Sequence, residues 1–139
     1  MSQERRAQVA DIDRLVEIRG AVRENRLSDS TSVTHADYED FVRRGRVWVR
    51  EVGQTIIGFS ASDDKDGSIW ALFVDEAFCR QGIGTALLSR ACDDLRRDSH
   101  PTAMLSTTPG TAAERLYRNL GWAEAGIEVN GEVRFRLAL

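Results

Sequence analysis

The chain has 139 residues, of which 42% are hydrophobic and 29% are charged, with a formal net charge of −3. This composition fits one soluble globular domain over residues 1–139, and the interspersed charges give no reason to expect nucleic-acid binding. No apolar stretch is long enough to span a membrane, the polar N-terminus is not a signal peptide, and the two cysteines suggest neither a disulfide framework nor a metal site, so we expect a cytoplasmic protein without a metal.

The first third of the chain predicts one short strand and two helices. Residues 6–9 are compatible with an edge strand. Asp11 is a suitable cap for a helix that runs to about residue 24, with Arg19 on the same helical stripe as its apolar residues. The polar segment 25–33 is typical of a loop. Residues 34–45 begin with a capping-box pattern and predict a short second helix.

The remainder predicts a three-stranded meander, a crossover helix, a short buried strand, another helix and a final hairpin. These elements cover residues 47–52, 55–62, 68–74, 82–97, 103–106, 112–120, 122–129 and 132–137, in that order. The dipeptide Asn130-Gly131 is the hairpin signal between the last two strands. A mixed sheet with helices on both faces is the simplest packing of this order.

The turn between the strand 68–74 and the helix 82–97 indicates an anion site. Gly82 and Gly84 allow a ligand to approach the backbone, and Arg80 adds positive charge. The first turn of a helix also offers unpaired N–H groups and a positive dipole end, which suit a phosphate or pyrophosphate. The alternatives are a tight turn into a core helix, or a nucleotide site unrelated to coenzyme A. The latter lacks the third glycine and the lysine that such sites require.

Residues 79–88 resemble the pyrophosphate loop of the GNAT superfamily of acyl-CoA N-acyltransferases, Arg/Gln-x-x-Gly-x-Gly/Ala. The two glycines fit this pattern, whereas Cys79 occupies its first position. Residues 113–122 are similar to the family's Ala-x-x-Phe-Tyr-x-x-x-Gly-Phe segment, with Gly110 where the family commonly has asparagine. The resemblance implies an α/β (α+β) fold whose central sheet is mixed, mostly antiparallel, and covered by helices on both faces.

The same resemblance implies transfer of an acetyl group from acetyl-CoA to a primary amine of a small-molecule or peptide acceptor, by direct attack in a ternary complex. The strand before the pyrophosphate loop would bulge and splay from the next strand, beside the acyl and pantetheine groups. Tyr117 would donate a proton to the leaving thiolate. The residues implied in acetyl-CoA binding are Phe73, Val74, Arg80, Gln81, Gly82, Ile83, Gly84 and Thr85.

No general base is assigned, because the strand 68–74 carries no carboxylate. The acidic candidates are Glu24, Asp29, Asp63 and Asp75, and each fits an ordinary solvated or capping role. His35 and His100 fit surface positions. The segment 25–33 lies where the family builds its acceptor site. A non-catalytic acyl-CoA-binding or sensing module is therefore the alternative function, and the final hairpin could pair across a homodimer.

Overall fold

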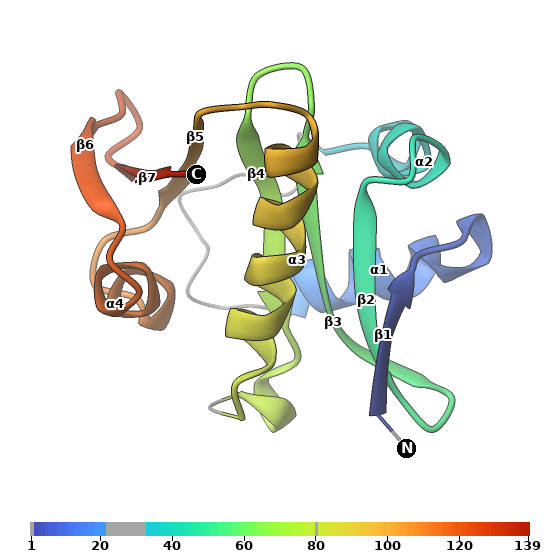
Figure 1. The fold of residues 1–139 in the computed structure, drawn as a ribbon. Coiled ribbons are helices and arrows are strands. Elements are labelled where there is room, and N and C mark those ends of the chain that lie inside the picture. The colour runs from blue at the N-terminus through green and yellow to red at the C-terminus, as the bar shows by residue number, and fades with distance from the viewer. Residues whose placement is uncertain (1, 22–32, 80) are drawn as a thin grey trace.

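The computed structural model describes residues 2–21, 33–79 and 81–139. Within them, seven strands form one sheet in the order β1-β2-β3-β4-β5-β7-β6 (Figure 1). The strands are β1 (Ser2–Arg6), β2 (Val47–Val52), β3 (Thr55–Asp63), β4 (Ser68–Val74), β5 (Thr102–Thr107), β6 (Ala123–Ile127) and β7 (Val133–Ala138). Only the β4–β5 pair is parallel among these neighbours. The mixed, mostly antiparallel sheet that the sequence predicted is confirmed.

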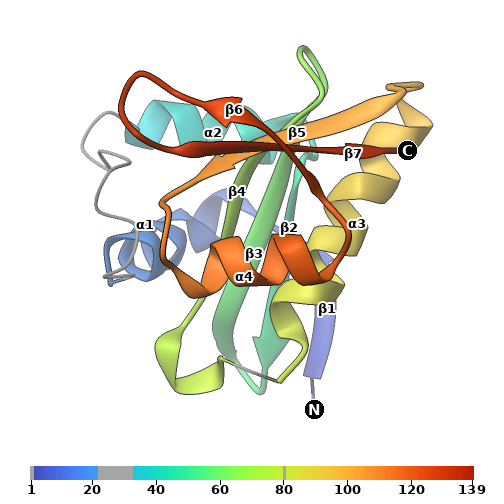
Figure 2. The same ribbon diagram turned by 90° about the vertical axis from the view of Figure 1, so that its left-hand side faces the viewer.

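Helices cover both faces of this sheet. The two N-terminal helices, α1 (Ile12–Ala21) and α2 (His35–Arg43), pack on one face, and α3 (Ile83–Arg97) and α4 (Ala112–Asn119) pack on the other. Figure 2 separates α1 and α2, on the left, from α3, on the right. We refer to these faces below as the α1 side and the α3 side.

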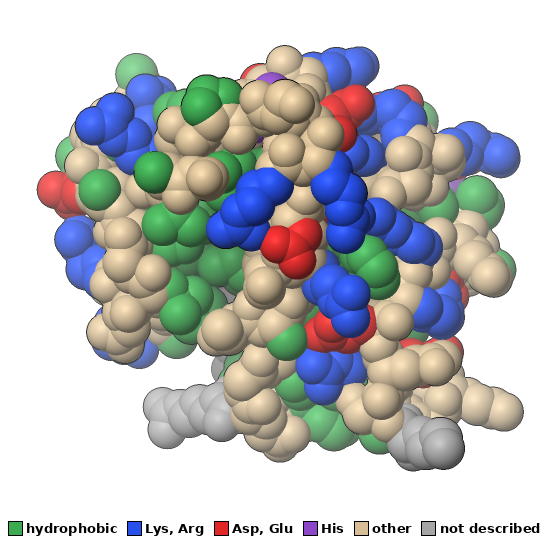
Figure 3. Space-filling model, in the orientation of Figure 1, with side chains coloured by type: hydrophobic (Ala, Val, Ile, Leu, Met, Phe, Trp, Pro, Cys, Tyr) green, Lys and Arg blue, Asp and Glu red, His purple; other side chains and the backbone are tan. Residues whose placement is uncertain are grey.

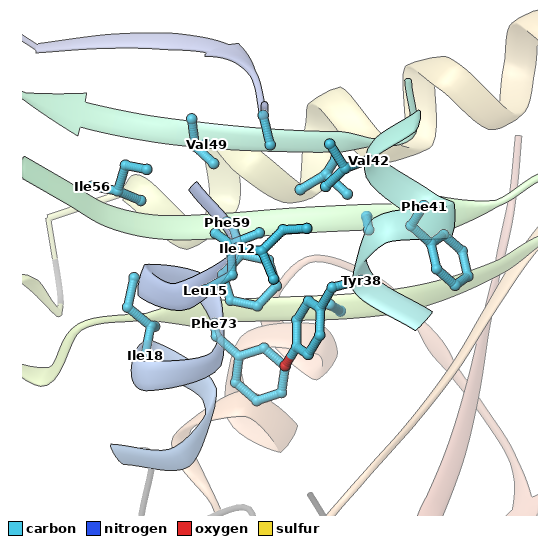
Figure 4. Close-up of a cluster of buried hydrophobic side chains, with 14 residues drawn as sticks. Ile12, Leu15, Ile18, Tyr38, Phe41, Val42, Val49, Ile56, Phe59 and Phe73 are labelled. Atoms are coloured by element: carbon cyan, nitrogen blue, oxygen red, sulfur yellow. The ribbon is translucent and has the colours of Figure 1, made fainter. Parts of the chain in front are cut away.

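The α1 side holds the larger hydrophobic cluster. Ile12, Leu15 and Ile18 recur at helical spacing on α1 and are at most 2% exposed. They pack against the aromatic side chains of β3 and β4, among them Phe59 and Phe73, as Figure 4 shows. This packing, together with the apolar residues of α2, fixes the position of α1 across the sheet.

A buried carboxylate ties the N-terminal strands to α3. Asp94, on α3, is 3% exposed and accepts hydrogen bonds from both terminal nitrogens of Arg6, at 2.7 and 2.9 Å. It also accepts from Trp48 Nε1 and from Arg97, each at 3.1 Å. Figure 3 shows basic side chains interspersed with acidic ones over this part of the surface. The network holds α3 against β1 and β2.

The two central parallel strands separate after one point of contact. The register between β4 and β5 contains the single pair Ser68–Met104, which lies near the start of both strands. The ends of the strands at Val74 and Thr107 therefore diverge. On its other edge, β4 stays paired with β3, with a bulge at Trp70 between the pairs that Ala71 and Ile69 make. The expected splay is present, and the bulge lies three residues before Phe73.

Two expectations for the N-terminus were wrong. The first strand spans Ser2–Arg6 and not residues 6–9. It pairs with β2, and its Arg5 side chain binds Glu51 and Asp11, so it is a charged edge strand without apolar alternation. Residues 9–11 form a short 3₁₀ helix instead. Asp11 is the third residue of that turn, where its carboxylate accepts from Gln8 N at 2.7 Å, and it does not cap α1. The expected end of this helix near Glu24 lies outside the described residues.

The last hairpin has a longer loop than the sequence suggested. Glu128 N donates to Glu132 O, and Gly131 N donates to Glu128 O. This pattern leaves a three-residue loop at 129–131, in which Gly131 has φ 91°. A type I turn followed by a left-handed glycine is the usual three-residue solution. Asn130 stabilises it by accepting from Glu132 N at 3.0 Å.

Candidate active site

A groove of about 380 Å³ opens where β4 and β5 diverge. Its walls come from β4, the N-terminus of α3, the end of β5 and α4. The groove runs continuously from the α3 N-terminus, at Gly82, to Tyr117 on α4. Figure 3 shows hydrophobic side chains in the hollow between α3 and the C-terminal part of the chain.

The N-terminus of α3 presents unobstructed backbone amides to this groove. Gly82 is the cap residue and has φ 77°, a conformation that favours glycine, and it has no side chain with which to cap the helix. A Cβ at this position would meet no atom within 4 Å, so the space above it is open. The first-turn N–H groups that follow, up to Thr85, lack intrahelical acceptors and lie at the positive end of a 15-residue helix. An anion fits here.

The β4 edge that faces β5 supplies a second set of amides. Asp75 N donates to Ile57 O on β3 at 2.8 Å. Because N–H groups alternate in direction along a strand, Phe73 N–H also faces β3, whereas Leu72 and Val74 N–H face the groove. Because β5 has diverged at this level, Val74 N–H is not part of the β4–β5 ladder. It can donate to a ligand in the groove.

Tyr117 is buried in the groove wall and remains protonated. It is 5% exposed, and its ring centroid lies 5.8 Å from that of Trp122 and 6.0 Å from that of Phe135. Burial, with a smaller contribution from Cys92, raises the pKa of its hydroxyl far above the ordinary value. The hydroxyl is therefore a proton donor throughout the neutral range.

Hydrogen bonds between residues 110, 111 and 114 cap the start of α4. Gly110 N donates to the carboxylate of Glu114 at 2.8 Å, and Thr111 Oγ1 accepts from Glu114 N at 3.2 Å. The helix that carries Tyr117 is thus capped by the Thr111 side chain, and Gly110 stands where the family commonly has asparagine.

Most of the predicted site residues lie together. Tyr117 and six of the eight residues implied in acetyl-CoA binding line the same groove, the six being Phe73, Val74, Gly82, Ile83, Gly84 and Thr85. Gln81 is exposed and is not part of the lining. Arg80 lies outside the described residues.

The described candidates for a general base have other roles. Asp75 accepts from Ala77 N and from Arg14, and these two contacts lower the pKa of its carboxyl. Asp63 accepts from Lys65 N in a turn, and His100 Nε2 lies 2.7 Å from Asp64 O. His35 begins α2. Among the described residues that line the groove, none is a carboxylate or a histidine. Glu24, Asp29 and most of the segment 25–33 are outside the described residues.

Sequence reasoning assigned no role to Arg19, which lines the groove from α1. Its guanidinium carbon lies 4.8 Å from the Phe73 ring centroid and 5.5 Å from that of Trp70. Trp70 also stacks on Phe41, with centroids 4.0 Å apart. The signal that could have found Arg19 is its place on the helical stripe four residues after the buried Leu15. The hydroxyls of Ser106, Thr107 and Thr111 were missed as well.

The family model of the acetyltransferase (GNAT) domain matches residues 43–124, which is more than half of the chain. The chain therefore belongs to the GNAT acetyltransferase family. No curated protein sequence matches it significantly.

Solved structures share the whole fold. Ard1 from Thermoplasma volcanium is 19% identical with a TM-score of 0.82, covering 99% of this chain and 97% of that one. The PaiA N-acetyltransferase from Thermoplasma acidophilum, in complex with coenzyme A, is 12% identical with a TM-score of 0.78, covering 100% and 99%. The putative acetyltransferase yncA from Salmonella typhimurium, with its cofactor acetyl-CoA, is 24% identical with a TM-score of 0.75, covering 100% and 94%.

The described residues lack two further features, a membrane-spanning helix and a metal-binding cluster. They contain no helix with the length and apolar character needed to cross a bilayer. They also contain no group of three or more His, Cys, Asp or Glu side chains placed to hold a metal ion.

Proposed function

We propose that the chain, as one domain of residues 1–139, transfers an acetyl group from acetyl-CoA to a primary amine by direct attack in a ternary complex. The observation that carries this proposal is the single groove that joins the open amides of α3 to the buried Tyr117. Acetyltransferase activity is the activity of the family to which the chain belongs, and two of the similar structures were solved with coenzyme A or acetyl-CoA.

In the proposed mechanism, different groups of the chain act at different points along the groove. The amides from Gly82 to Thr85 hold the pyrophosphate, with Arg80 and Gln81 of the same loop. Val74 N–H donates to the thioester oxygen, where negative charge develops. Phe73 supports this segment through its packing beneath α1. Tyr117 donates its proton to the departing sulfur.

The proposed acetyl transfer needs no covalent enzyme intermediate. The amine nitrogen forms a bond to the acetyl carbon as the carbon–sulfur bond breaks. Tyr117 protonates the thiolate and recovers a proton from solvent, and the amine loses a proton to solvent. Because the described groove lining has no base, the amine must arrive neutral or lose its proton to water.

Calorimetry with acetyl-CoA tests the binding half of the proposal. We expect a dissociation constant in the micromolar range, which is common for enzyme substrates. Thr85→Asp should weaken binding by roughly 5- to 30-fold, because it places a negative charge at the pyrophosphate amides. The same change favours the free helix, since an acid at its first turn suits the dipole.

Ser89→Asp is the matched control, because Ser89 is exposed on α3 and is not part of the groove lining. This variant should bind acetyl-CoA as the unchanged protein does. The proposal fails if the unchanged protein does not bind acetyl-CoA at millimolar concentration, or if the two aspartate variants bind it equally well.

A non-catalytic acyl-CoA-binding module is the second candidate, and the lack of a base in the described lining is the observation that favours it. Such a module would bind acetyl-CoA and release no thiol with any amine. Thiol release over a panel of amines separates the two functions.

A further inference from the structure

Arg19 carries the only formal charge among the described residues that line the groove. It projects from the last turn of α1, so it reaches the groove from the α1 side of β4, opposite the α3 amides. Its guanidinium lies against Phe73, the residue next to Val74, whose N–H faces the groove. A positive charge therefore stands close to the expected position of the acetyl group.

The described residues satisfy this guanidinium only in part. Arg19 Nε and Nη1 are buried and have no hydrogen-bond partner among them. The faces of Phe73 and Trp70 attract the cation but accept no N–H bond of ordinary strength. The neighbouring Tyr38 hydroxyl forms a hydrogen bond with the Arg19 side chain. Burial raises the pKa of that hydroxyl and Arg19 offsets only part of the rise, so Tyr38 is neutral and supplies no counter-charge.

Other arginines that pack against the sheet are paired. Arg6 binds Asp94 at 2.7 Å, Arg14 binds Asp75 at 2.9 Å, and Arg46 binds Asp98 at 2.7 Å. Each of these three arginines thus has a carboxylate beside it, whereas no described carboxylate is recorded as a partner of Arg19. Leaving a buried charged donor unsatisfied is costly, and a bound ligand can supply the partner that Nε and Nη1 of Arg19 lack.

We propose that Arg19 binds a carboxylate of the acceptor, so that the acceptor is a small amine carrying a carboxylate, such as a free amino acid. The inference rests on the proposed acetyl transfer. A guanidinium presents parallel N–H donors that match the two oxygens of a carboxylate. A polyamine or a lysine-rich peptide would instead bring positive charge to a groove whose only described charge is already positive.

Matched acceptors test this proposal. Thiol release from acetyl-CoA would be measured with the twenty amino acids, β-alanine, the amides of the amino acids that react, and spermidine. We expect at least one amino acid to be acetylated with a kcat/KM about tenfold or more above that of its own amide. A missing partner for a buried charged donor produces this scale of discrimination.

Substitution of Arg19 then assigns the preference to a side chain. Arg19→Gln should lower kcat/KM for the amino acid by roughly 10- to 100-fold and leave that for the amide within about threefold. Arg19→Lys should keep part of the preference, because the charge remains while the paired geometry is lost. Arg43→Gln is the control, since Arg43 is exposed on α2 and pairs with Glu39.

Three results overturn the inference: no carboxylate in the panel is acetylated, amides or spermidine react at least as well, or Arg19→Gln slows both members of a pair equally. Calorimetry with acetyl-CoA distinguishes failure of the proposed function from failure of the carboxylate inference. If acetyl-CoA does not bind the unchanged protein, the proposed function itself fails. If acetyl-CoA binds and spermidine is the better acceptor, only the carboxylate inference fails.

Discussion

Tyr117→Phe removes one oxygen from the groove and leaves the surrounding packing in place. The ring of Tyr117 contacts Trp122 and Phe135 at centroid distances of 5.8 and 6.0 Å, and a phenylalanine ring can keep both contacts. The hydroxyl belongs to a residue that is 5% exposed. We therefore expect the free energy of unfolding to change by no more than about 1 kcal/mol.

The expected effect on turnover is larger and falls on kcat. A hydrogen bond to a charged group contributes about 1.5–3 kcal/mol, and the sulfur acquires its charge only as it leaves. Losing that bond should lower kcat roughly 10- to 150-fold. The acetyl-CoA dissociation constant should stay within about twofold, because in the proposed mechanism the hydroxyl acts on the departing sulfur and not on bound acetyl-CoA.

The pH profile supplies an independent check. Because burial raises the pKa of Tyr117, its proton stays bound as the pH rises through 10. The rate should therefore increase as the acceptor amine loses its proton, with no fall below pH 10 that ionisation of this tyrosine would cause. The pH profile of Tyr117→Phe should have the same shape, with lower rates at every pH.

Steady-state kinetics with a thiol reagent, with acetyl-CoA binding by calorimetry alongside, measure each of these quantities. A kcat within threefold of that of the unchanged protein would refute the role of Tyr117 as proton donor. So would a loss of rate that follows entirely from weaker acetyl-CoA binding.

The remaining predictions concern stability and thiol chemistry. Asp94→Asn breaks a buried ion pair whose arginine partner is partly exposed, so it should lower the free energy of unfolding in urea by about 2–3 kcal/mol. Its neighbour Asp93 is 47% exposed, and Asp93→Asn should change that value by no more than about 0.5 kcal/mol; equal losses would contradict the assignment. At pH 8 a thiol reagent should modify the exposed Cys79 quickly and Cys92 slowly, because burial raises the pKa of Cys92 to about 11. Acetyl-CoA should slow the reaction of Cys79, which lines the groove, and two equally fast thiols would be the contrary result.

The elements that the sequence predicted well are those with local signals. The capping box at the start of α2 is present, with Asp37 N donating to Thr34 Oγ1 at 3.2 Å and Thr34 N donating to Asp37 Oδ2 at 2.8 Å. The β2–β4 meander and α3 follow from alternation, turn residues and helical periodicity, which involve only neighbouring residues.

The features that the sequence did not predict depend on distant partners. β1 is held by charges on β2 and α3, so its own residues show no strand pattern. The sequence does not distinguish Asp94 from the other acidic residues of its helix. Only the fold brings Arg6 to it, from 88 residues away. The proposed role of Arg19 likewise depends on the tertiary structure, which buries its Nε and Nη1 without a hydrogen-bond partner among the described residues.

The divergence of β4 and β5 explains how one groove could serve two substrates. In a continuous sheet, β4 would separate the α3 amides from Arg19 on α1. Because the two strands share a single pair at Ser68, the gap beyond it is open to residues of both faces. An acyl donor anchored on the α3 side and an acceptor anchored on the α1 side would then meet at Val74. This arrangement is compatible with the proposed direct transfer, since each substrate would reach the same N–H from its own side and no enzyme nucleophile would have to carry the acetyl group between them.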